Sequence, residues 1–139
     1  MALNDFQEIV NDFNFLDDWD DRYRYIIDLG KKLKTLDNIL KNDTNKVIGC
    51  ASQVWLTYDV INNGASKIIS FKGDSDAVIV KGLIAIVLTL YNEETINNAK
   101  NINALAELDK LGLQEHLSSQ RSNGLRAMIE KINMIVSRC

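Results

Sequence analysis

Residues 53–73 read QVWLTYDVINNGASKIISFKG, and this stretch decides the fold. Its first part alternates apolar with more polar residues, which is the pattern of a strand with one buried face. The apolar positions are Val54, Leu56, Tyr58 and Val60. Asn63-Gly64 then predicts a hairpin with a type I′ turn, because that turn requires positive φ at both central positions. A return strand is expected over 67–71, ending near Gly73, and Val47-Ile48 is expected to add a short third strand.

Helical patterns precede this hairpin. Apolar residues recur at helical spacing over 3–13, where Asn4 and Gln7 resemble a capping box. A second helix is expected to open at Asp17-Asp18, because carboxylates suit the positive end of a helix dipole. Gly30 is expected to end this helix in a left-handed cap.

Helical patterns also follow the hairpin. The segment 77–91 is apolar nearly all round, which predicts a core helix packed across the sheet, with side chains of 74–76 capping its start. A short helix is expected over 104–111, stopped by Gly112. The last helix carries an apolar stripe made of Leu125, Met128, Ile129, Ile132, Ile135 and Val136.

The order of these elements, ααβββααα, predicts an α+β fold in which helices cover a small antiparallel three-stranded sheet. A chain of 139 residues fits one domain, and no linker or repeat divides it. We therefore expect a single domain over 1–139. Its hydrophobic content of 46% is ordinary for a globular protein and argues against disorder.

Charge and hydropathy exclude several classes of partner. The net charge of −3 is a poor basis for binding a phosphate backbone, so no nucleic acid is expected. The longest apolar run, 77–91, is interrupted by Lys81 and is too short to span a bilayer. The first residues lack the pattern of a signal peptide, and two cysteines alone do not indicate secretion. We expect a reducing, cytoplasmic location.

The residues also limit the chemistry. Zinc or an iron–sulfur cluster needs three or four soft ligands, and two distant cysteines with one histidine, His116, fall short. No glycine-rich nucleotide-binding motif is present. We therefore expect no metal and no cofactor. A hydrolase built on Cys50 and His116 is an alternative, but nothing in the sequence indicates that the two residues meet.

Cys50 is the remaining candidate for reactive chemistry. It lies between a short apolar segment and the hairpin, and is therefore expected on a loop at the edge of the sheet. Gly49 before it permits a tight bend or the close approach of another backbone. The thiolate is the reactive form of cysteine. On composition alone a small buried hydrophobe is the commoner role of a free cysteine, so the residues by themselves indicate no more than a candidate nucleophile.

Four blocks of sequence carry a resemblance to a known family. VIGCASQVWL at 47–56 looks like the active-loop signature of the SufE/CsdE family, and 18–30 is similar to the family's second helix. GDSDAVIVKGL at 73–83 resembles its capped core helix, and 116–125 the entry to its last helix. Two departures are Ser119, where the family usually has proline, and Ala51, where glutamine or methionine is common. Neither removes a reacting group.

The resemblance implies a sulfur carrier with no cofactor of its own. A pyridoxal-phosphate cysteine desulfurase, SufS-like or CsdA-like, forms a persulfide, and Cys50 attacks its terminal sulfur. The persulfide on Cys50 is then delivered to a SufBCD-type scaffold, and clearing the product stimulates the desulfurase. The family fold is similar to that of IscU-type scaffolds, although their three-cysteine ligand set is missing here.

The resemblance also implies residues that bind the partner. They are Gly49, Ala51, Ser52, Gln53, Asp74, Ser75 and Arg121. On the residues alone, Asp74 and Ser75 are most simply helix caps. Arg121 suits either docking to the desulfurase or pairing with an internal carboxylate. The sequence leaves open which desulfurase is the partner and whether the protein forms a homodimer.

The carrier role agrees with the cysteine content. A neighbouring thiol would expel the sulfane sulfur and close a disulfide, and Cys50 has no such neighbour in the sequence. Val47 and Ile48 are expected to shield the loaded sulfur, and Cys139 to be incidental. Such a protein is not a free-standing enzyme. The alternative from another class is a non-catalytic partner that regulates the desulfurase by binding alone.

Overall fold

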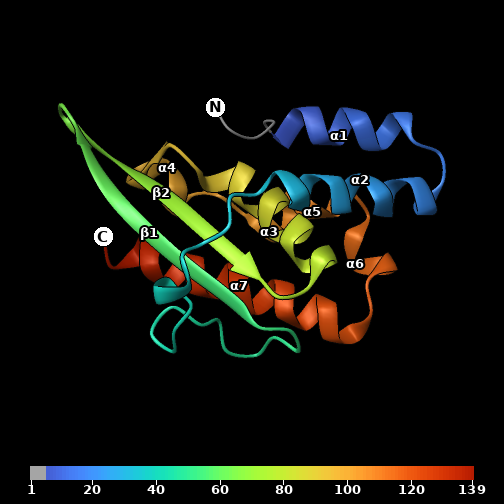
Figure 1. The fold of residues 1–139 in the computed structure, drawn as a ribbon. Helices are drawn as coiled ribbons and strands as arrows, with labels where there is room; N and C mark the ends of the chain where they lie inside the picture. The colour runs from blue at the N-terminus through green and yellow to red at the C-terminus, as the bar shows by residue number, and fades with distance from the viewer. Residues whose placement is uncertain (1–5) are drawn as a thin grey trace.

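The computed structural model describes residues 6–139, and helices precede and follow a hairpin in the chain order (Figure 1). The helices before the hairpin are α1 (Phe6–Phe15), α2 (Trp19–Lys32) and the 3₁₀ turn η1 (Asn38–Leu40). The helices after it are α3 (Val78–Tyr91), α4 (Ile96–Lys100), α5 (Ala104–Asp109), α6 (Leu113–His116) and α7 (Ser119–Ser137). Within these residues, no helix has the length and apolar character needed to cross a bilayer. The capping box expected at Asn4 lies outside the described residues.

The sheet is antiparallel and three-stranded, as predicted, with the order β1-β2-β3. Strand β1 (Val54–Asn63) pairs with β2 (Ser66–Ser75), and β2 pairs with the two-residue strand β3 (Glu94–Thr95). The third strand thus follows α3, and the observed order is ααββαβαααα. Val47-Ile48 is not a strand. The chain makes one bridge, between Lys46 and Trp55, before Gly49 at φ 102° turns it away from the sheet.

The hairpin turn differs from the type I′ turn predicted. Asn63 pairs with Ser66, so the two central residues are Gly64 and Ala65. Gly64 has φ 68°, whereas Ala65 is not among the described residues with positive φ. Positive φ at the first central position alone is the pattern of a type II′ turn, which glycine at that position favours. Asn63 remains in the strand because its pairing with Ser66 extends the ladder by one step.

Strand β1 is buried only near its base, whereas β2 keeps Ile69 and Phe71 buried farther out. Val54, Trp55 and Leu56 are buried, whereas Tyr58 and Val60 are 46% and 40% exposed. Figure 1 shows the distal part of β1 and β2 projecting beyond the helices. The period-two pattern therefore predicted the strand correctly but not how little of it the helices cover.

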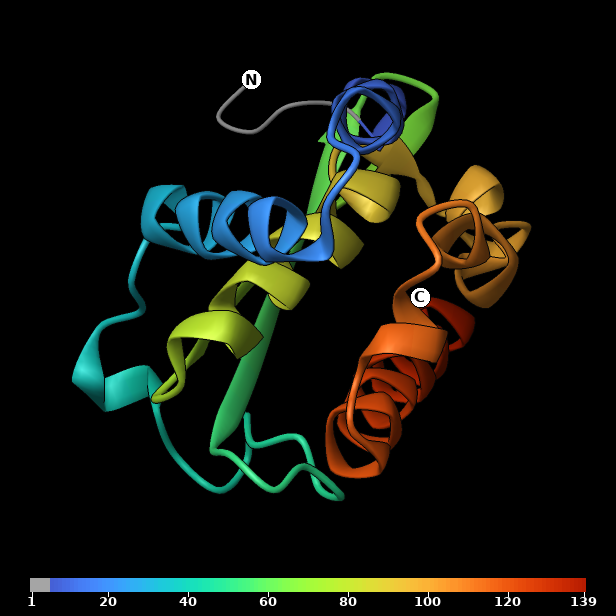
Figure 2. The same ribbon diagram turned by 90° about the vertical axis from the view of Figure 1, so that its right-hand side faces the viewer.

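Helix α3 forms the centre of the core, as its apolar sequence predicted. Every residue over 82–88 is buried, and the helix packs against β2 and α2. Figure 2 shows α2 crossing next to α3. At this crossing a Cβ atom on Gly82 would lie 2.1 Å from the carbonyl oxygen of Ile26, and one on Gly30 would lie 2.6 Å from the nitrogen of Gly82. At Gly30 and Gly82 the two helices therefore approach too closely for any residue larger than glycine.

This contact corrects the role expected for Gly30. The residue lies inside α2, which continues to Lys32, with Leu33 as its C-cap. Gly30 does not have positive φ. It is required for the close approach of α3, a role that only the tertiary structure reveals. Asp18 does cap the helix as expected, since its side chain accepts a hydrogen bond from the backbone N–H of Asp20.

Helix α7 closes the molecule against α3 and α4. Ser118 caps it by accepting a hydrogen bond from the backbone N–H of Arg121. The buried stripe follows the prediction, with Leu125, Met128, Ile129, Ile132 and Val136 buried. Ser119 is the first helical residue, a position where proline fits because its fixed φ is helical and its missing N–H needs no partner. The departure at Ser119 therefore leaves the helix start intact.

Candidate functional site

Cys50 lies on a loop that leaves the sheet edge after Val47 and returns to it at Val54. Two backbone hydrogen bonds of 2.8 Å hold the start of this loop, from Val47 N–H to the Val54 carbonyl and from Leu56 N–H to the Asn45 carbonyl. Lys131 on α7 adds a third tie, since its Nζ donates to the Lys46 carbonyl at 3.0 Å. The loop is thus anchored at its base, next to the residues that carry Cys50.

The Cys50 side chain forms part of the wall of a pocket of ≈ 340 Å³. The pocket is lined by the loop and β1, by α3 through Val80 and Leu83, and by the first half of α7. The Cys50 Sγ lies 3.5 Å from the carbonyl oxygen of Gly124. A Cβ on Gly124 would lie 3.3 Å from this sulfur, so glycine lets the loop sit against α7.

The thiol is half-buried in this position. Burial raises the pKa of the Cys50 thiol above its ordinary value, because a charged sulfur loses hydration there. At neutral pH the resting form is therefore the neutral thiol, which is a weaker nucleophile than the thiolate. The reactive form is favoured only when the loop exposes the sulfur or a positive charge approaches it.

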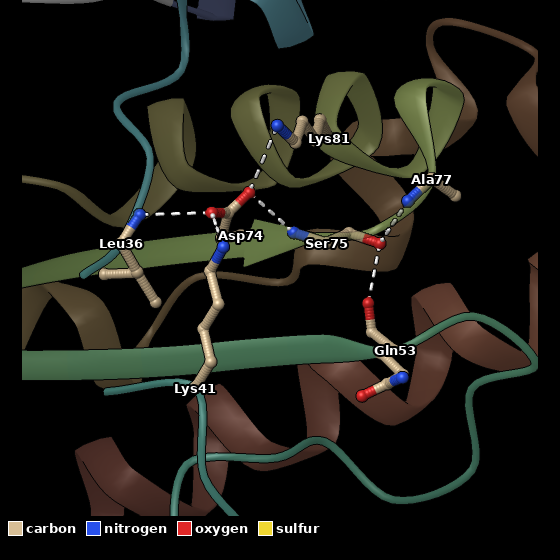
Figure 3. Close-up of polar contacts among 7 residues, drawn as sticks. All are labelled: Leu36, Lys41, Gln53, Asp74, Ser75, Ala77 and Lys81. Carbon is tan, nitrogen blue, oxygen red and sulfur yellow. Dashed lines mark hydrogen bonds and ion pairs between the residues drawn. The ribbon is translucent and has the colours of Figure 1, made fainter. Parts of the chain in front are cut away.

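The other end of the loop is held at Gln53 by Asp76 and by Ser75, whose contact Figure 3 shows. The Ser75 hydroxyl donates to the Gln53 carbonyl at 2.7 Å and accepts from the Ala77 N–H at 3.2 Å. The Asp76 carboxylate accepts from the Gln53 N–H at 3.0 Å. These contacts fix the point at which the loop enters β1.

Asp74 stabilises the same region from inside the protein, where it is 1% exposed. Its carboxylate accepts hydrogen bonds from the backbone N–H groups of Leu36 at 3.1 Å and Ser75 at 2.8 Å. It also forms ion pairs with Lys41 at 3.3 Å and Lys81 at 3.5 Å. One carboxylate thereby joins β2, α3 and the segment that follows α2 (Figure 3).

These contacts correct the capping role expected for 74–76. The N-cap of α3 is Ala77, whose methyl group accepts no hydrogen bond from the helix. Asp74 and Ser75 belong to the end of β2. Both residues are buried, at 1% and 3% exposure, so their side chains do not lie on a surface that a partner contacts in this conformation. Ser75 instead helps to fix the position of the loop, through its hydrogen bond to the Gln53 carbonyl.

The ionisation of Asp74 predicts a pH dependence of stability. Burial on its own raises the pKa of the Asp74 carboxyl group, but the hydrogen bonds and the two lysines outweigh it and place the pKa below the ordinary 3.8. A lowered folded-state pKa stabilises the protein at pH values above the unfolded-state pKa, and this contribution is lost as the pH falls through the folded-state pKa.

We therefore expect Asp74→Asn to lower the free energy of unfolding by about 1–3 kcal/mol at pH 7, because a buried charged hydrogen-bond acceptor is lost. The difference from wild type should shrink progressively below about pH 4, where the unfolded-state carboxyl group becomes protonated, and should disappear once the pH falls below the lowered folded-state pKa. Urea unfolding at pH 7 and pH 3 measures both values. A difference that stays constant with pH would show that the charge of Asp74 does not stabilise the fold.

The remaining predicted residues lie at or near the pocket mouth. Gly49, Ala51, Gln53 and Arg121 are exposed and Ser52 is partly buried. Ala51, Ser52 and Arg121 line the pocket together with Cys50. Arg121 has no ion-pair partner among residues 6–139, so its pairing with an internal carboxylate is not observed there.

His116 and Cys139 lie at other sites. The His116 ring stacks on Trp19 at a centroid distance of 3.9 Å, and its backbone carbonyl accepts from the Tyr23 hydroxyl. It lines a different pocket from Cys50. Cys139 is exposed and lines a further pocket near the hairpin. Among the described residues, no group of three or more histidine, cysteine or acidic side chains is placed to hold a metal.

The sequence did not identify most of the pocket wall. Val47 is buried but does not line the pocket, and Ile48 is 79% exposed, whereas Val80, Leu83 and Met128 are among the apolar residues that line it. These residues belong to the apolar patterns of α3 and α7. Such patterns predict that a side chain is buried, but not which residues it packs against. Gly124, just before the apolar stripe of α7, was the one local signal of a close approach.

The chain is similar to known proteins over nearly its whole length. A family model described as "SufE: Fe-S metabolism associated domain" matches residues 7–136. An uncharacterized SufE-like protein of Rhizobium meliloti is 47% identical over 130 residues, covering 94% of this chain and 93% of that protein. Another from Rhizobium etli is 51% identical over 132 residues, covering 95% and 89%. The solution structure of a hypothetical protein from Thermus thermophilus has a TM-score of 0.74 at 14% identity, covering 99% and 97%, and it shares the fold.

Proposed function

The chain belongs to the SufE family, and from this premise we propose that Cys50 accepts a sulfane sulfur from a cysteine desulfurase and carries it as a persulfide. The family predicted from four sequence blocks is thereby confirmed. The observation that carries the proposal is the position of Cys50 in the wall of a pocket that, among the described residues, no second thiol lines. The loaded sulfur is then passed to an assembly scaffold for iron–sulfur clusters, of the SufBCD type.

The transfer is an exchange in which no external oxidant or reductant takes part. The Cys50 thiolate attacks the terminal sulfur of the donor persulfide, a bond forms between the two sulfurs, and the donor's own sulfur–sulfur bond breaks. The donor cysteine leaves as a thiolate, and Cys50 now holds the persulfide. The proton lost by the Cys50 thiol passes to solvent or to the leaving thiolate.

The pocket suits the product of this step. A persulfide adds one sulfur atom to Cys50, and ≈ 340 Å³ of space leaves room for it beside Leu83 and Met128. Ser118, Gln120 and Arg121 from the start of α7 also line the pocket. The Arg121 guanidinium would stabilise an anionic outer sulfur that reached it within the pocket.

The resting loop protects the thiol more than it activates it. Burial raises the pKa of the Cys50 thiol, so outward movement of the loop favours the thiolate that attacks the donor. Gly49 at φ 102° is the residue about which such a movement is easiest, because glycine adopts this conformation without strain. Docking of the desulfurase on exposed Gly49, Ala51, Gln53 and Arg121 is the event that we propose releases the loop.

Two other functions are less well supported. A cysteine hydrolase needs a base beside the nucleophile, and His116 lines another pocket and stacks on Trp19. A regulator that acts by binding alone requires no thiol in the pocket, and the position of Cys50 favours the carrier. The carrier works with a donor and an acceptor, in the cytoplasm, where thiols remain reduced.

Mass spectrometry of the loaded protein tests the proposal. After incubation with a pyridoxal-phosphate cysteine desulfurase and cysteine, the peptide that contains Cys50 should gain about 32 Da, the mass of one sulfur atom, and lose it on reduction with dithiothreitol. A reaction without cysteine is the control. Stimulated desulfurase turnover with no added mass on Cys50 would instead support the binding regulator.

A further inference from the structure

Strand β1 has a free edge over its distal half. The sheet order places β1 outermost, and its outer edge is paired at its base through Lys46 and through the hydrogen bond from Leu56 N–H to the Asn45 carbonyl. Successive residues of a strand point their backbone groups to opposite edges. The outward groups beyond Leu56 therefore belong to Tyr58, Val60 and Asn62. Within residues 6–139, nothing hydrogen-bonds to them.

A groove opens where this free edge begins, at Tyr58, and the free edge continues beyond it through Val60 and Asn62. The groove has a volume of ≈ 520 Å³ and is lined by residues from both faces of β1, Tyr58 on one face and Asp59 on the other. Its far wall consists of Met134, Ile135 and Arg138 at the end of α7. Tyr58 and Met134 are about half exposed, at 46% and 50%. Apolar side chains beside unpaired backbone groups are the features that an added strand uses.

The charges around the groove are mostly positive. Lys72, Lys131 and Arg138 line it, with Asp59 as the one acid among the described lining residues. None of the three cations forms an ion pair within the described part of the chain. This local excess contrasts with the net charge of −3 of the whole chain.

We propose that this groove binds an extended, acidic segment of a partner protein, which adds a strand to the free edge of β1. Backbone hydrogen bonds to Tyr58, Val60 and Asn62 give affinity, and acidic side chains meet Lys72 and Arg138. A second copy of this chain fits poorly, because pairing β1 with itself brings two positive grooves together. A nucleic acid has no groups that match a strand edge, and the net charge opposes it.

The groove lies next to the Cys50 pocket without including it. On β1, Val54 lines the pocket and Leu56, two residues later, lines the groove. On α7, Met128 lines the pocket and Lys131, about one turn later, lines the groove. A segment bound in the groove leaves Cys50 uncovered. The binding therefore does not depend on sulfur transfer and can be measured with the Cys50→Ser variant.

The test uses a synthetic peptide of alternating glutamate and valine, and a matched peptide with lysine in place of glutamate. We expect the acidic peptide to shift the amide NMR signals of 57–63 and 134–138, and the basic peptide to bind more weakly. Lys72→Glu combined with Arg138→Glu should raise the Kd about tenfold or more, because like charges then face each other. Lys32→Glu combined with Lys100→Glu makes the same charge change away from the groove and should leave the Kd unchanged.

A second variant separates strand addition from simple charge attraction. Val60→Pro removes an outward N–H, and proline is tolerated on edge strands, so the amide spectrum should remain folded while the acidic peptide binds less tightly. Equal binding of both peptides, an unchanged Kd in the Lys72/Arg138 variant, or tighter binding of a single-stranded oligonucleotide would overturn the proposal. So would dimerisation through 57–63 in sedimentation experiments, which would make a second copy the occupant.

Discussion

Cys50→Ser is expected to abolish sulfur loading and, with it, stimulation of the desulfurase. A serine hydroxyl does not form the anion needed to attack a sulfane sulfur at neutral pH, so the exchange stops at its first step. The substitution is nearly isosteric at a half-buried position, and stability should change by about 1 kcal/mol or less. The measurement is alanine release from cysteine by the desulfurase, with thermal unfolding alongside to show that the fold is intact.

Cys139→Ser is the matched control for this experiment. Cys139 is exposed, lines a different pocket, and its thiol contacts the Ile135 carbonyl at the end of α7. The variant should load and stimulate like wild type. Full stimulation by Cys50→Ser would refute the carrier and leave the binding regulator, whereas loss of activity in Cys139→Ser would show that the second thiol takes part.

We expect Gly82→Ala to destabilise the protein more than the addition of a single methyl group at any other position. Alanine favours helix over glycine by about 1 kcal/mol, so propensity alone predicts a more stable α3. The added Cβ would, however, lie 2.1 Å from the Ile26 carbonyl oxygen and 2.4 Å from its Cγ2. Helices α2 and α3 must move apart, and we expect a loss of about 3 kcal/mol or more.

Thermal unfolding of the two proteins measures this effect, and the melting temperature should fall by about 10 °C or more for a domain of this size. Gly64→Ala is the control, because a Cβ there meets nothing within 4 Å although φ is +68°. It should lose only about 1 kcal/mol through backbone strain. If Gly82→Ala were as stable as Gly64→Ala, the close crossing of α2 and α3 would not be a major constraint on the fold.

The sequence correctly predicted the helices and strands whose formation depends on residues close together in the chain. The first strand of the hairpin and the stripe of α7 were indicated by a repeat, and α3 by a long apolar segment, and the structure contains all three. The loop position of Cys50 followed from its place between the chain segments at Val47 and Val54. Periodic patterns succeed here because burial of one face acts on every turn or every second residue.

Short or isolated signals were less reliable. The apolar pair Val47-Ile48 was taken for a strand, whereas Glu94–Thr95, which has no apolar residue, forms one because the chain after α3 passes beside Ile68 and Ile69. Gly30 was taken for a cap because it stands near lysines at a helix end. A single glycine indicates either a positive φ or the close approach of another segment, and only the tertiary structure shows which of the two applies.

By itself, the sequence determined the class of fold, which depends on local hydrophobic patterns, and the family, which four blocks of residues indicate, and it predicted Cys50 as the reacting group. The tertiary structure decided that Asp74 is a buried tie between three segments, that Leu83, Gly124 and Met128 surround Cys50, and that β1 keeps an open edge. Each of these features depends on groups that lie far apart in the chain and that packing brings within a few ångströms of one another. Local patterns in the sequence do not predict such contacts.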